Sequence, residues 1–244
     1  MKKVLEVVNL SKNFGDVKVL DGINLSIYEG EVVVILGKSG CGKSTLLRCI
    51  NGLETIDGGE IIFDGKTLTK STMNISEVRQ KIGMVFQNYE LFPHLNVIDN
   101  IMIAPIKVQK IEKEKVKIEA LNLLARVGLK DKAYSKPQEL SGGQKQRVAI
   151  IRALILNPEI LLFDEVTASL DPEMTREVLE VILELAKSKK TMMVVTHEMQ
   201  FARAVADRII FISDGEIAEE NTAAGFFTNP KTEKAKSFLN TFIY

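Results

Sequence analysis

The sequence has few of the features expected of a secreted, membrane-spanning or disulfide-stabilised protein. Its 244 residues include no tryptophan, two histidines and two cysteines. Cys41 and Cys49 lie too far apart along one expected helix to form a disulfide, which argues against a disulfide or zinc framework. No apolar run approaches the roughly 18 residues that span a bilayer. The basic start becomes too polar from Asn9 onward for a signal peptide. We therefore expect a cytosolic protein.

The sequence also has no excess of charge of either sign. Lysine and arginine together number 32, and aspartate and glutamate also number 32. This balance argues against broad, sequence-independent binding of nucleic acid, which depends on an excess of cations, although it does not exclude a local basic patch. Hydrophobic residues make up 45% of the chain, enough for one large domain or one domain with an insertion.

The chain is organised around residues 32–51, where an apolar run breaks into a glycine-rich loop and then a helix-forming run. The loop has the spacing GxxxxGK[ST] of a phosphate-binding P-loop. Its glycines let the main chain approach phosphate, and backbone N–H groups and the helix dipole then attract the anion. We expect Lys43 to reach the outer phosphates and the Ser44 hydroxyl to bind Mg²⁺. The predicted nucleotide-binding residues here are Gly37, Lys38, Ser39, Gly40, Cys41, Gly42, Lys43, Ser44 and Thr45.

Two simpler interpretations of this stretch remain open. The pattern could be a glycine-rich turn in an α/β protein. Cys41 could be a small loop residue rather than a redox switch, although a helix N-terminus can lower the pKa of a thiol.

The pattern of apolar residues divides the rest of the chain into a β-rich part, a helical part and an α/β part. The predicted strands are residues 3–8, 17–28, 60–63, 82–86, 160–163, 192–195, 209–212 and 216–218. Helical periodicity replaces alternation from about residue 88 to 156. Asp171 and Pro172 predict a helix start, with Val178, Ile182 and Leu185 on its inner face. A short amphipathic helix is expected near the end, with Phe238, Leu239, Phe242 and Ile243 as its apolar residues. We expect an α/β fold with a helical insertion.

Two carboxylates follow a fully apolar predicted strand. Asp164 and Glu165 stand directly after residues 160–163, and ligands of open α/β sheets collect at this end of the strands. Asp164 is suited to hold Mg²⁺, and Glu165 is suited to orient and deprotonate a water that attacks a γ-phosphate. The pair alone is a weak signal, but it becomes strong together with the upstream P-loop.

A second anion-binding arrangement begins at Ser141. A serine and two glycines stand at a predicted helix start, which supplies a hydroxyl, free N–H groups and a dipole. Since one P-loop already holds a nucleotide's phosphates, a second phosphate-binding loop suggests contact with the nucleotide of another copy. With Leu140 to Gln144 reading LSGGQ, the sequence resembles the ATP-binding subunits of ABC transporters, and the motifs follow the order typical of that family.

The resemblance implies a RecA-like P-loop NTPase core with an N-terminal antiparallel β subdomain and a helical subdomain. The implied single domain, residues 1–244, has a core of 1–87 and 157–244 and a helical subdomain of 88–156. ATP hydrolysis with Mg²⁺ is implied, with Glu165, His197 and Gln87 as catalytic residues. Ser44, Gln87 and Asp164 are the implied metal ligands. The other implied nucleotide-binding residues are Phe14, which stacks on adenine unless it is buried in the core, and Ser141, Gly142, Gly143 and Gln144 of the signature.

The loop after Glu165 departs from the family pattern. The family usually has proline at the position of Val166 and Ser-Ala two residues later, whereas this chain has Ala168 and then Ser169. Losing the proline relaxes a rigid turn, so we expect hydrolysis at an altered rate. Ser169 to Asp171 match the D-loop, which crosses between subunits.

The resemblance also implies partners and a location. Two copies form a head-to-tail homodimer around ATP, and transmembrane permease subunits dock near residues 87–101. Tyr89 and Phe92 either form part of that docking patch or pack internally. An extracytoplasmic substrate-binding protein is an indirect partner, nucleic acid is not a partner, and the subunit is peripheral at the cytoplasmic face of the membrane.

The resemblance is to ATPases of polar amino-acid uptake, through residues 47–51, 88–101, 170–174 and 196–199. The alternatives are an importer ATPase for another small solute and a soluble ABC ATPase outside transport. A P-loop switch of another class would lack LSGGQ, and a purely structural nucleotide-binding module would lack Glu165.

Overall fold

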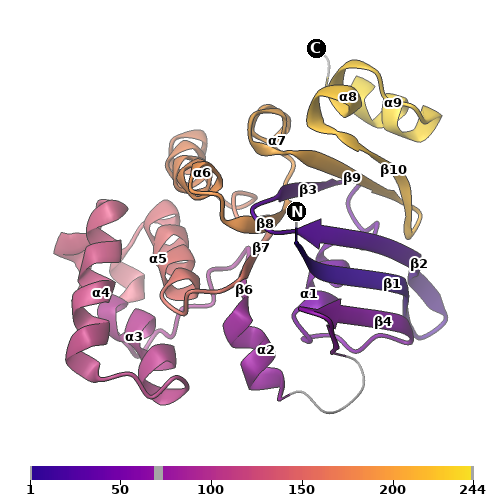
Figure 1. Cartoon of the computed structure of the whole chain (residues 1–244). Helices are drawn as coiled ribbons and strands as arrows, with labels where there is room; N and C mark the ends of the chain where they lie inside the picture. The colour runs from indigo at the N-terminus through magenta and orange to yellow at the C-terminus, as the bar shows by residue number, and fades with distance from the viewer. Residues whose placement is uncertain (1, 69–73, 243–244) are drawn as a thin grey trace.

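A six-stranded sheet forms the centre of the molecule in the computed structural model, which describes residues 2–68 and 74–242 (Figure 1). Its strands, in spatial order, are β10 (Glu216–Thr222), β9 (Arg208–Ser213), β3 (Val32–Leu36), β8 (Thr191–Val195), β7 (Ile160–Asp164) and β6 (Ile82–Val85). All neighbours are parallel except β10, which pairs antiparallel with β9. Every residue of β3, β7 and β8 is buried. Apart from Thr191 at the start of β8 and Asp164 at the end of β7, these residues are apolar, as expected for a parallel sheet covered on both faces.

A second sheet is antiparallel and contains the N-terminus. Its order is β2 (Val17–Tyr28), β1 (Lys3–Phe14), β4 (Gly58–Phe63) and β5 (Lys66–Thr67). Helix α1 (Lys43–Ile50) follows the glycine-rich loop and buries Leu46 and Leu47 in a core shared by both sheets. This packing places the start of α1 between the two sheets.

The predicted strand 3–8 is longer in the structure and continues to Phe14. Alternation stops at Asn9, which has a left-handed φ of 48°. Register shifts nevertheless keep β1 paired with β2 as far as Phe14 opposite Val17. The local irregularity explains why the sequence pattern ended early.

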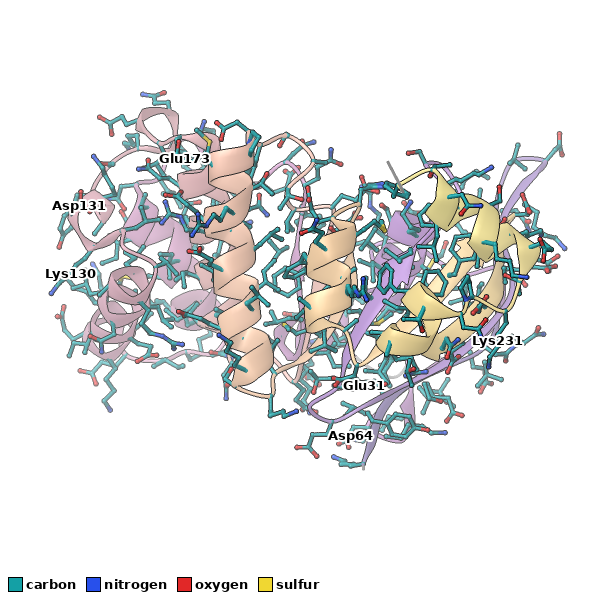
Figure 2. The ribbon with its side chains drawn as sticks, turned by 90° about the horizontal axis from the view of Figure 1, so that it is seen from above. Glu31, Asp64, Lys130, Asp131, Glu173 and Lys231 are labelled. Atoms are coloured by element: carbon teal, nitrogen blue, oxygen red, sulfur yellow. The ribbon has the colours of Figure 1, made fainter. Side chains whose placement is uncertain are left out.

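The helices between β6 and β7 have a hydrophobic core of their own. They are α3 (Val97–Lys107), α4 (Lys113–Arg126) and α5 (Gly142–Leu154), joined by the short turns η1 (Lys130–Lys132) and η2 (Pro137–Glu139), while α2 (Ile75–Lys81) precedes β6. Ile101, Leu124 and Val148 are among the residues that pack together there. Seen from above, this helical end carries Lys130 and Asp131, and Asp64 and Lys231 lie toward the other end (Figure 2).

The remaining helices cover one face of the central sheet. They are α6 (Pro172–Lys187), α7 (Met199–Val205), α8 (Ala223–Thr228) and α9 (Glu233–Asn240). The predicted start of α6 is confirmed, because the Asp171 side chain accepts a hydrogen bond from Met174 N and Pro172 is the first helical residue. Its predicted inner face is confirmed as well, with Val178, Ile182 and Leu185 all buried.

The prediction for the C-terminal helix was partly wrong. Phe238 and Leu239 are buried, but Phe242 lies beyond the end of α9 and is 43% exposed. Ile243 falls outside the described residues. Within the described part of the chain, none of the helices has both the length and the apolar composition to cross a membrane.

Candidate functional site

The glycine-rich loop between β3 and α1 lies close against the second sheet. Gly40 and Gly42 have positive φ angles of 80° and 99°. A Cβ on Gly42 would lie 2.8 Å from the carbonyl oxygen of Val19 and 2.7 Å from Leu20 Cδ2. No L-residue fits there without strain and displacement of the main chain. The positive φ of Gly42 and the close approach of β2 therefore require glycine in this loop, and they leave its main chain in the conformation of a phosphate cradle.

Lys43 is held beneath this loop by the loop's own carbonyl groups. Its side chain is 4% exposed, and Nζ donates hydrogen bonds to the oxygens of Gly37 at 3.1 Å and Lys38 at 3.0 Å. Helix α1 starts at Lys43 without a side-chain cap from Gly42. The uncapped helix start and the fixed ammonium together present positive potential to an anion.

Two carboxylates approach the start of α1 from β7. Asp164 ends β7, and its Oδ1 accepts a hydrogen bond from Ser44 Oγ at 2.5 Å. Burial raises the pKa of the Asp164 carboxyl above its usual value, opposed by the hydrogen bond from Ser44 and the charge of Arg48. A hydroxyl and a carboxylate at this separation supply the oxygen ligands that Mg²⁺ prefers.

Glu165 turns away from the strand direction and meets both a lysine and a histidine. Its φ is 47°, an uncommon conformation for a residue other than glycine. Its backbone N–H donates to Val195 O at 3.0 Å, and Oε1 lies 3.7 Å from Lys43 Nζ and 3.0 Å from His197 Nε2. Strained backbone of this kind clusters at functional sites, where surrounding contacts maintain it.

The structure thus brings five predicted site residues into one cluster. They are Lys43, Ser44, Asp164, Glu165 and His197, which we call the carboxylate cluster. Parallel β3, β8 and β7 are neighbours in the sheet, so the segments after their carboxyl ends meet at one edge. Gln87 is exposed just after β6, and no hydrogen bond joins its side chain to the cluster within the described residues.

Phe14 is not a core residue. It ends β1 and is 47% exposed, and Lys12 Nζ lies 4.9 Å from the centroid of its ring. Leu20, opposite Lys12 in the hairpin, touches the Gly42 position of the P-loop. The ring is therefore exposed at the end of the hairpin that contacts the P-loop, and an exposed aromatic ring is able to stack on a base.

The signature loop, residues 140–144, makes hydrogen bonds within itself and packs against other segments of the same chain. Ser141 caps α5, with its Oγ accepting from Gln144 N at 3.3 Å and its N–H donating to Gln144 Oε1 at 3.0 Å. A Cβ on Gly142 would lie 2.8 Å from Leu170 Cδ2, and one on Gly143 would lie 3.0 Å from Met174 Cβ. Among the described residues, no hydrogen bond or ion pair links this loop to the carboxylate cluster.

The unusual loop after Glu165 is held by burial rather than by a proline ring. Val166 is 3% exposed and packs into the core beneath α6. Two turns follow, with Ala168 N donating to Glu165 O and Leu170 N donating to Thr167 O, each at 3.1 Å. The buried Val166 side chain and these two turns thus provide contacts that hold the loop where a proline is absent.

Burial disfavours the thiolate form of both cysteines. Both are free thiols, and burial raises the pKa of Cys41 and raises the pKa of Cys49 to about 11. Burial therefore outweighs the expected lowering by a helix N-terminus.

Two grooves border these elements. The first, of about 860 Å³, is lined by residues that include Arg48, Phe86, Phe92, Lys107, Val108 and Arg152. Phe92 is 42% exposed there, whereas Tyr89 is half-buried and its hydroxyl lies 3.3 Å from Ser169 Oγ. The predicted aromatic patch is therefore split, with one ring in the groove and the other directed inward.

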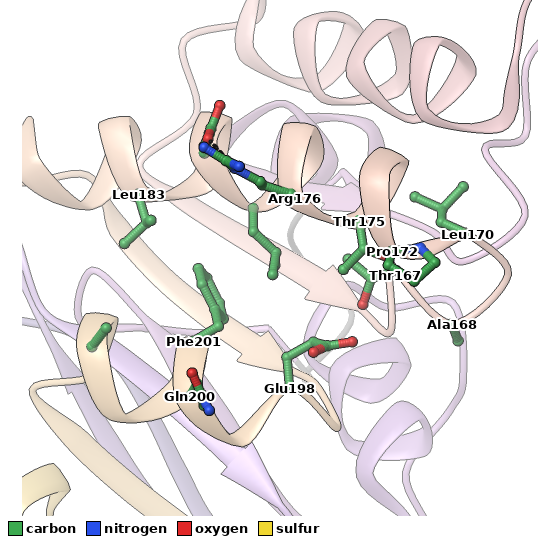
Figure 3. A pocket seen from close by; sticks show the side chains of 13 residues that line it. Thr167, Ala168, Leu170, Pro172, Thr175, Arg176, Leu183, Glu198, Gln200 and Phe201 are labelled. Carbon is green, nitrogen blue, oxygen red and sulfur yellow. Dashed lines mark hydrogen bonds and ion pairs between the residues drawn. The ribbon is translucent and has the colours of Figure 1, made fainter.

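The second groove, of about 710 Å³, lies between α6 and α7 (Figure 3). Leu183, Glu198 and Phe201 point into it, and it reaches Thr167 beside the carboxylate cluster. Among the described residues that line this groove, none belongs to the cluster.

Sequence reasoning missed a residue that shapes the first groove. Asn100 is fully buried in α3, accepts a hydrogen bond from Phe92 N at 2.7 Å and donates one to Phe92 O at 3.1 Å. The available signal was a polar residue at an inward position of a helix that is otherwise apolar on that side.

Comparisons with known proteins agree with this geometry. The family described as ABC transporter matches residues 20–168. The chain is 53% identical to the glutamine transport ATP-binding protein GlnQ of Geobacillus stearothermophilus, covering 96% of this chain and 97% of that protein. It is 51% identical to the glutamate transport ATP-binding protein GluA of Corynebacterium glutamicum, covering 98% and 99%.

Among solved structures, the chain is similar to the dimeric post-hydrolysis state of the ATP-binding cassette MJ0796 bound to ADP and Pi. The TM-score is 0.79 at 35% identity, with 90% of this chain and 98% of that chain covered. The structure of cbiO1 from Clostridium perfringens gives a TM-score of 0.83 at 30% identity, with coverage of 99% and 96%.

Proposed function

The chain belongs to the ABC transporter family, and from this premise we propose that it hydrolyses ATP to power the uptake of a polar amino acid across a membrane. Its family membership makes it an ATP-binding subunit and an ATPase. Relatives named for glutamine and glutamate transport support a polar amino acid as cargo, since they match nearly the whole chain. Contacts to the cargo itself belong to other subunits, so this chain contributes the energy rather than the selection.

The observation that carries the proposal is the carboxylate cluster. Lys43, held at the cradle, binds the outer phosphates of ATP. Glu165 orients the attacking water and accepts its proton, while His197, in contact with Glu165, binds the γ-phosphate. The reaction is then accelerated by positioning and by charges that are already in place before ATP arrives.

The residues present fit a magnesium ion. Ser44 Oγ and Asp164 Oδ1 would hold it, together with Gln87 from the end of β6. When bound, Mg²⁺ supplies positive charge that offsets the charge of the phosphate oxygens. Asp164 is already buried at a cost that raises its pKa, so a cation there relieves an unfavourable burial of charge.

A second copy of the chain completes each site. Ser141, Gly142, Gly143 and Gln144 of one copy contact the ATP held by the P-loop of the other, in a head-to-tail homodimer. The similarity to a cassette solved as a dimer supports this arrangement. Ser169 to Asp171 lie between the cluster and the signature helix, so closure of the dimer acts on both.

The first groove is the docking site for transmembrane permease subunits near residues 87–101. Its apolar lining, with Phe92 and Val108, suits a helix, and Arg48, Lys107 and Arg152 suit acidic groups. Docking there makes the chain peripheral at the cytoplasmic face, with a substrate-binding protein reached only through the permease. Residues 88–156 then move as a helical subdomain relative to a core of 1–87 and 157–244.

Light scattering combined with phosphate release tests this function. Glu165→Gln removes the proton acceptor but keeps the side chain's size, so we expect hydrolysis to fall at least about 100-fold. The variant should trap an ATP-bound dimer, while the wild type returns to monomer as ATP is consumed. Glu119→Gln, on the exposed side of α4, serves as the matched control.

Two results would count against the proposal. If Glu165→Gln releases phosphate at the wild-type rate, Glu165 is not the proton acceptor. If the variant binds ATP but stays monomeric, the composite site is contradicted for the isolated chain. Repeating the measurement with the membrane partner then shows whether dimerisation requires it.

A further inference from the structure

The hydroxyl of Tyr89 lies where three loops meet. Tyr89 is two residues after Gln87, at the end of the segment that follows β6. Its hydroxyl is 3.3 Å from Ser169 Oγ, within hydrogen-bond distance. A Cβ built on Gly142, in the signature loop, would lie 3.0 Å from the same hydroxyl oxygen. The hydroxyl of Tyr89, which belongs to the segment after β6, thus lies close to both the loop after the cluster and the start of α5.

The segment that carries Tyr89 is held in an unusual conformation. Tyr89 and Glu90 have left-handed φ angles of 60° and 51°. Two adjacent residues in this region are costly unless other contacts maintain them. Arg152 supplies such contacts, because its guanidinium donates hydrogen bonds to Glu90 O at 2.5 Å and Tyr89 O at 3.1 Å.

The same helix holds the segment at an earlier point. Gln146 is fully buried, and its Nε2 donates to Phe86 O at 3.1 Å, immediately before Gln87. Gln146 and Arg152 both belong to α5, whose first turn is the signature loop. The segment from Phe86 to Glu90 is therefore fastened to the helix that presents the signature.

The partner of Tyr89 belongs to the loop that carries Glu165. Ser169 is exposed apart from this contact and lies near two structural anchors. Leu170 N donates to Thr167 O in a turn that contains Ser169, and just after this turn the Asp171 side chain caps α6. The hydroxyl at this position is the departure noted in the sequence, where serine and alanine stand in the reverse of the usual order.

We propose that Tyr89 is a positioning residue, whose hydroxyl couples the α5-bound segment to the loop after Glu165 by hydrogen bonding to Ser169. The inference deepens the proposed ATPase function and rests on it. When α5 and its segment are in place, the hydrogen bond holds the loop so that Glu165 faces the γ-phosphate. Among the described residues, no hydrogen bond joins the Tyr89 side chain to the carboxylate cluster, so it acts on catalysis only through the loop.

A double-mutant cycle tests the coupling. Tyr89→Phe and Ser169→Ala each remove one hydroxyl of the pair. Each should lower kcat about two- to tenfold, the range expected for one hydrogen bond, with KM for ATP within about twofold of wild type. The double variant should be no slower than the slower single variant, because either change already breaks the bond. Ser169→Thr keeps a hydroxyl and should recover most of the activity.

A matched control removes a different tyrosine hydroxyl. Tyr134 is 66% exposed, so Tyr134→Phe should leave kcat unchanged. Thermal unfolding of all variants separates positioning from stability, since an effect on kcat without a loss of Tm is not a folding defect. If Tyr89→Phe does not fold, Ser169→Ala on its exposed loop still tests the pair.

The proposal is overturned by an unchanged kcat in either single variant, by a change in KM alone, or by effects that multiply in the double variant. Failure of the proposed function gives a different result. In that case the wild type releases no phosphate, or Glu165→Gln releases it as fast as the wild type. If the wild type is active, Glu165→Gln inactivates it, and the double-mutant cycle shows either no effect or effects that multiply, then only the role of Tyr89 is contradicted.

Discussion

The two glycine-rich loops of this chain need glycine for different physical reasons. In the P-loop, Gly42 has a φ of 99°, and a Cβ there would meet the main chain of β2 at 2.8 Å. In the signature loop, Gly142 and Gly143 have no positive φ and belong to the first turn of α5. A Cβ on Gly142 would meet side-chain atoms of Leu170 and Tyr89 at 2.8 and 3.0 Å.

This difference shows what each loop can do by itself. The P-loop is shaped by backbone conformation and by Lys43 bonded to its own carbonyls, so it is complete in one copy. The signature loop is shaped by close packing on the loop after Glu165 and on the start of α6. Its shape therefore depends on the position of its neighbours, and in the proposed head-to-tail dimer it would meet phosphate only across the interface.

The largest expected effect comes from Lys43 and Ser141 variants, which should show that the P-loop controls ATP binding and the signature loop controls dimer formation. Lys43→Ala removes a buried ammonium, so we expect ATP affinity of the isolated chain to fall about 10- to 150-fold. Ser141→Ala should leave that affinity within about twofold and abolish the ATP-bound dimer in the Glu165→Gln background. Calorimetric titration at low protein concentration measures the first quantity, and light scattering measures the second.

Lys130→Ala is the control for loss of a lysine, because Lys130 is exposed at the far helical end (Figure 2). Equal losses of ATP affinity in Lys43→Ala and Ser141→Ala would contradict the division between the loops. The same conclusion would follow if Ser141→Ala in the Glu165→Gln background still formed the dimer at the ATP concentration at which Glu165→Gln alone forms it.

Much of the P-loop side was predictable, because its determinants are local in sequence. Glycine spacing, the apolar strand and the carboxylates at residues 164 and 165 all report on contacts within a few residues. The meetings of Asp164 with Ser44 and of Glu165 with Lys43 and His197 needed the strand order, and the parallel-sheet rule already indicated them.

The signature side was less predictable, because its determinants are distant contacts. The packing of Gly142 against Tyr89 and Leu170 joins three segments, and no sequence periodicity reports it. The same holds for Arg152, which grips Tyr89 from the far end of α5. The sequence therefore left open whether Tyr89 docks a partner or packs internally, and in the structure it is half-buried with its hydroxyl 3.3 Å from Ser169 Oγ.

The second prediction uses alanine at matched positions in the two loops. Gly42→Ala combines an unfavourable φ with a clash against a fixed carbonyl, so the free energy of unfolding should fall by about 2 to 3 kcal/mol. Gly142→Ala meets side chains that can move, so it should cost less than about 1 kcal/mol. It displaces Tyr89 and Leu170, however, and should still slow hydrolysis several-fold.

Urea unfolding of both variants, followed by circular dichroism, checks this difference. A larger loss of stability in Gly142→Ala than in Gly42→Ala would show that the signature loop, rather than the P-loop, is the more rigidly constrained of the two. Wild-type hydrolysis by Gly142→Ala would show that its packing does not reach the site.

The smallest expected effect concerns the aromatic beside the P-loop. Lys12 is nearly buried, with Nζ 4.9 Å from the Phe14 centroid and 3.9 Å from Glu54 Oε2. The ammonium lies over the ring, which is 47% exposed, so we expect the base to stack on the face away from Lys12. Lys12→Met keeps the aliphatic stem but loses the cation, so KM for ATP should rise about two- to fivefold with kcat unchanged.

The effect of Lys12 must act through the ring, which gives the prediction its control. In a Phe14→Leu background, Lys12→Met should change KM no further, because the ring that the cation orients is absent. Since the chain has no tryptophan, Phe14→Trp would place a single tryptophan at the site. When Lys12 is also replaced by Met, a higher ATP concentration should be needed to quench the fluorescence of this tryptophan by half. Equal KM increases for Lys12→Met with and without the ring would instead show that Lys12 acts on the phosphates of ATP. The P-loop side would then contain, within a single copy, a second lysine that acts on the phosphates besides Lys43.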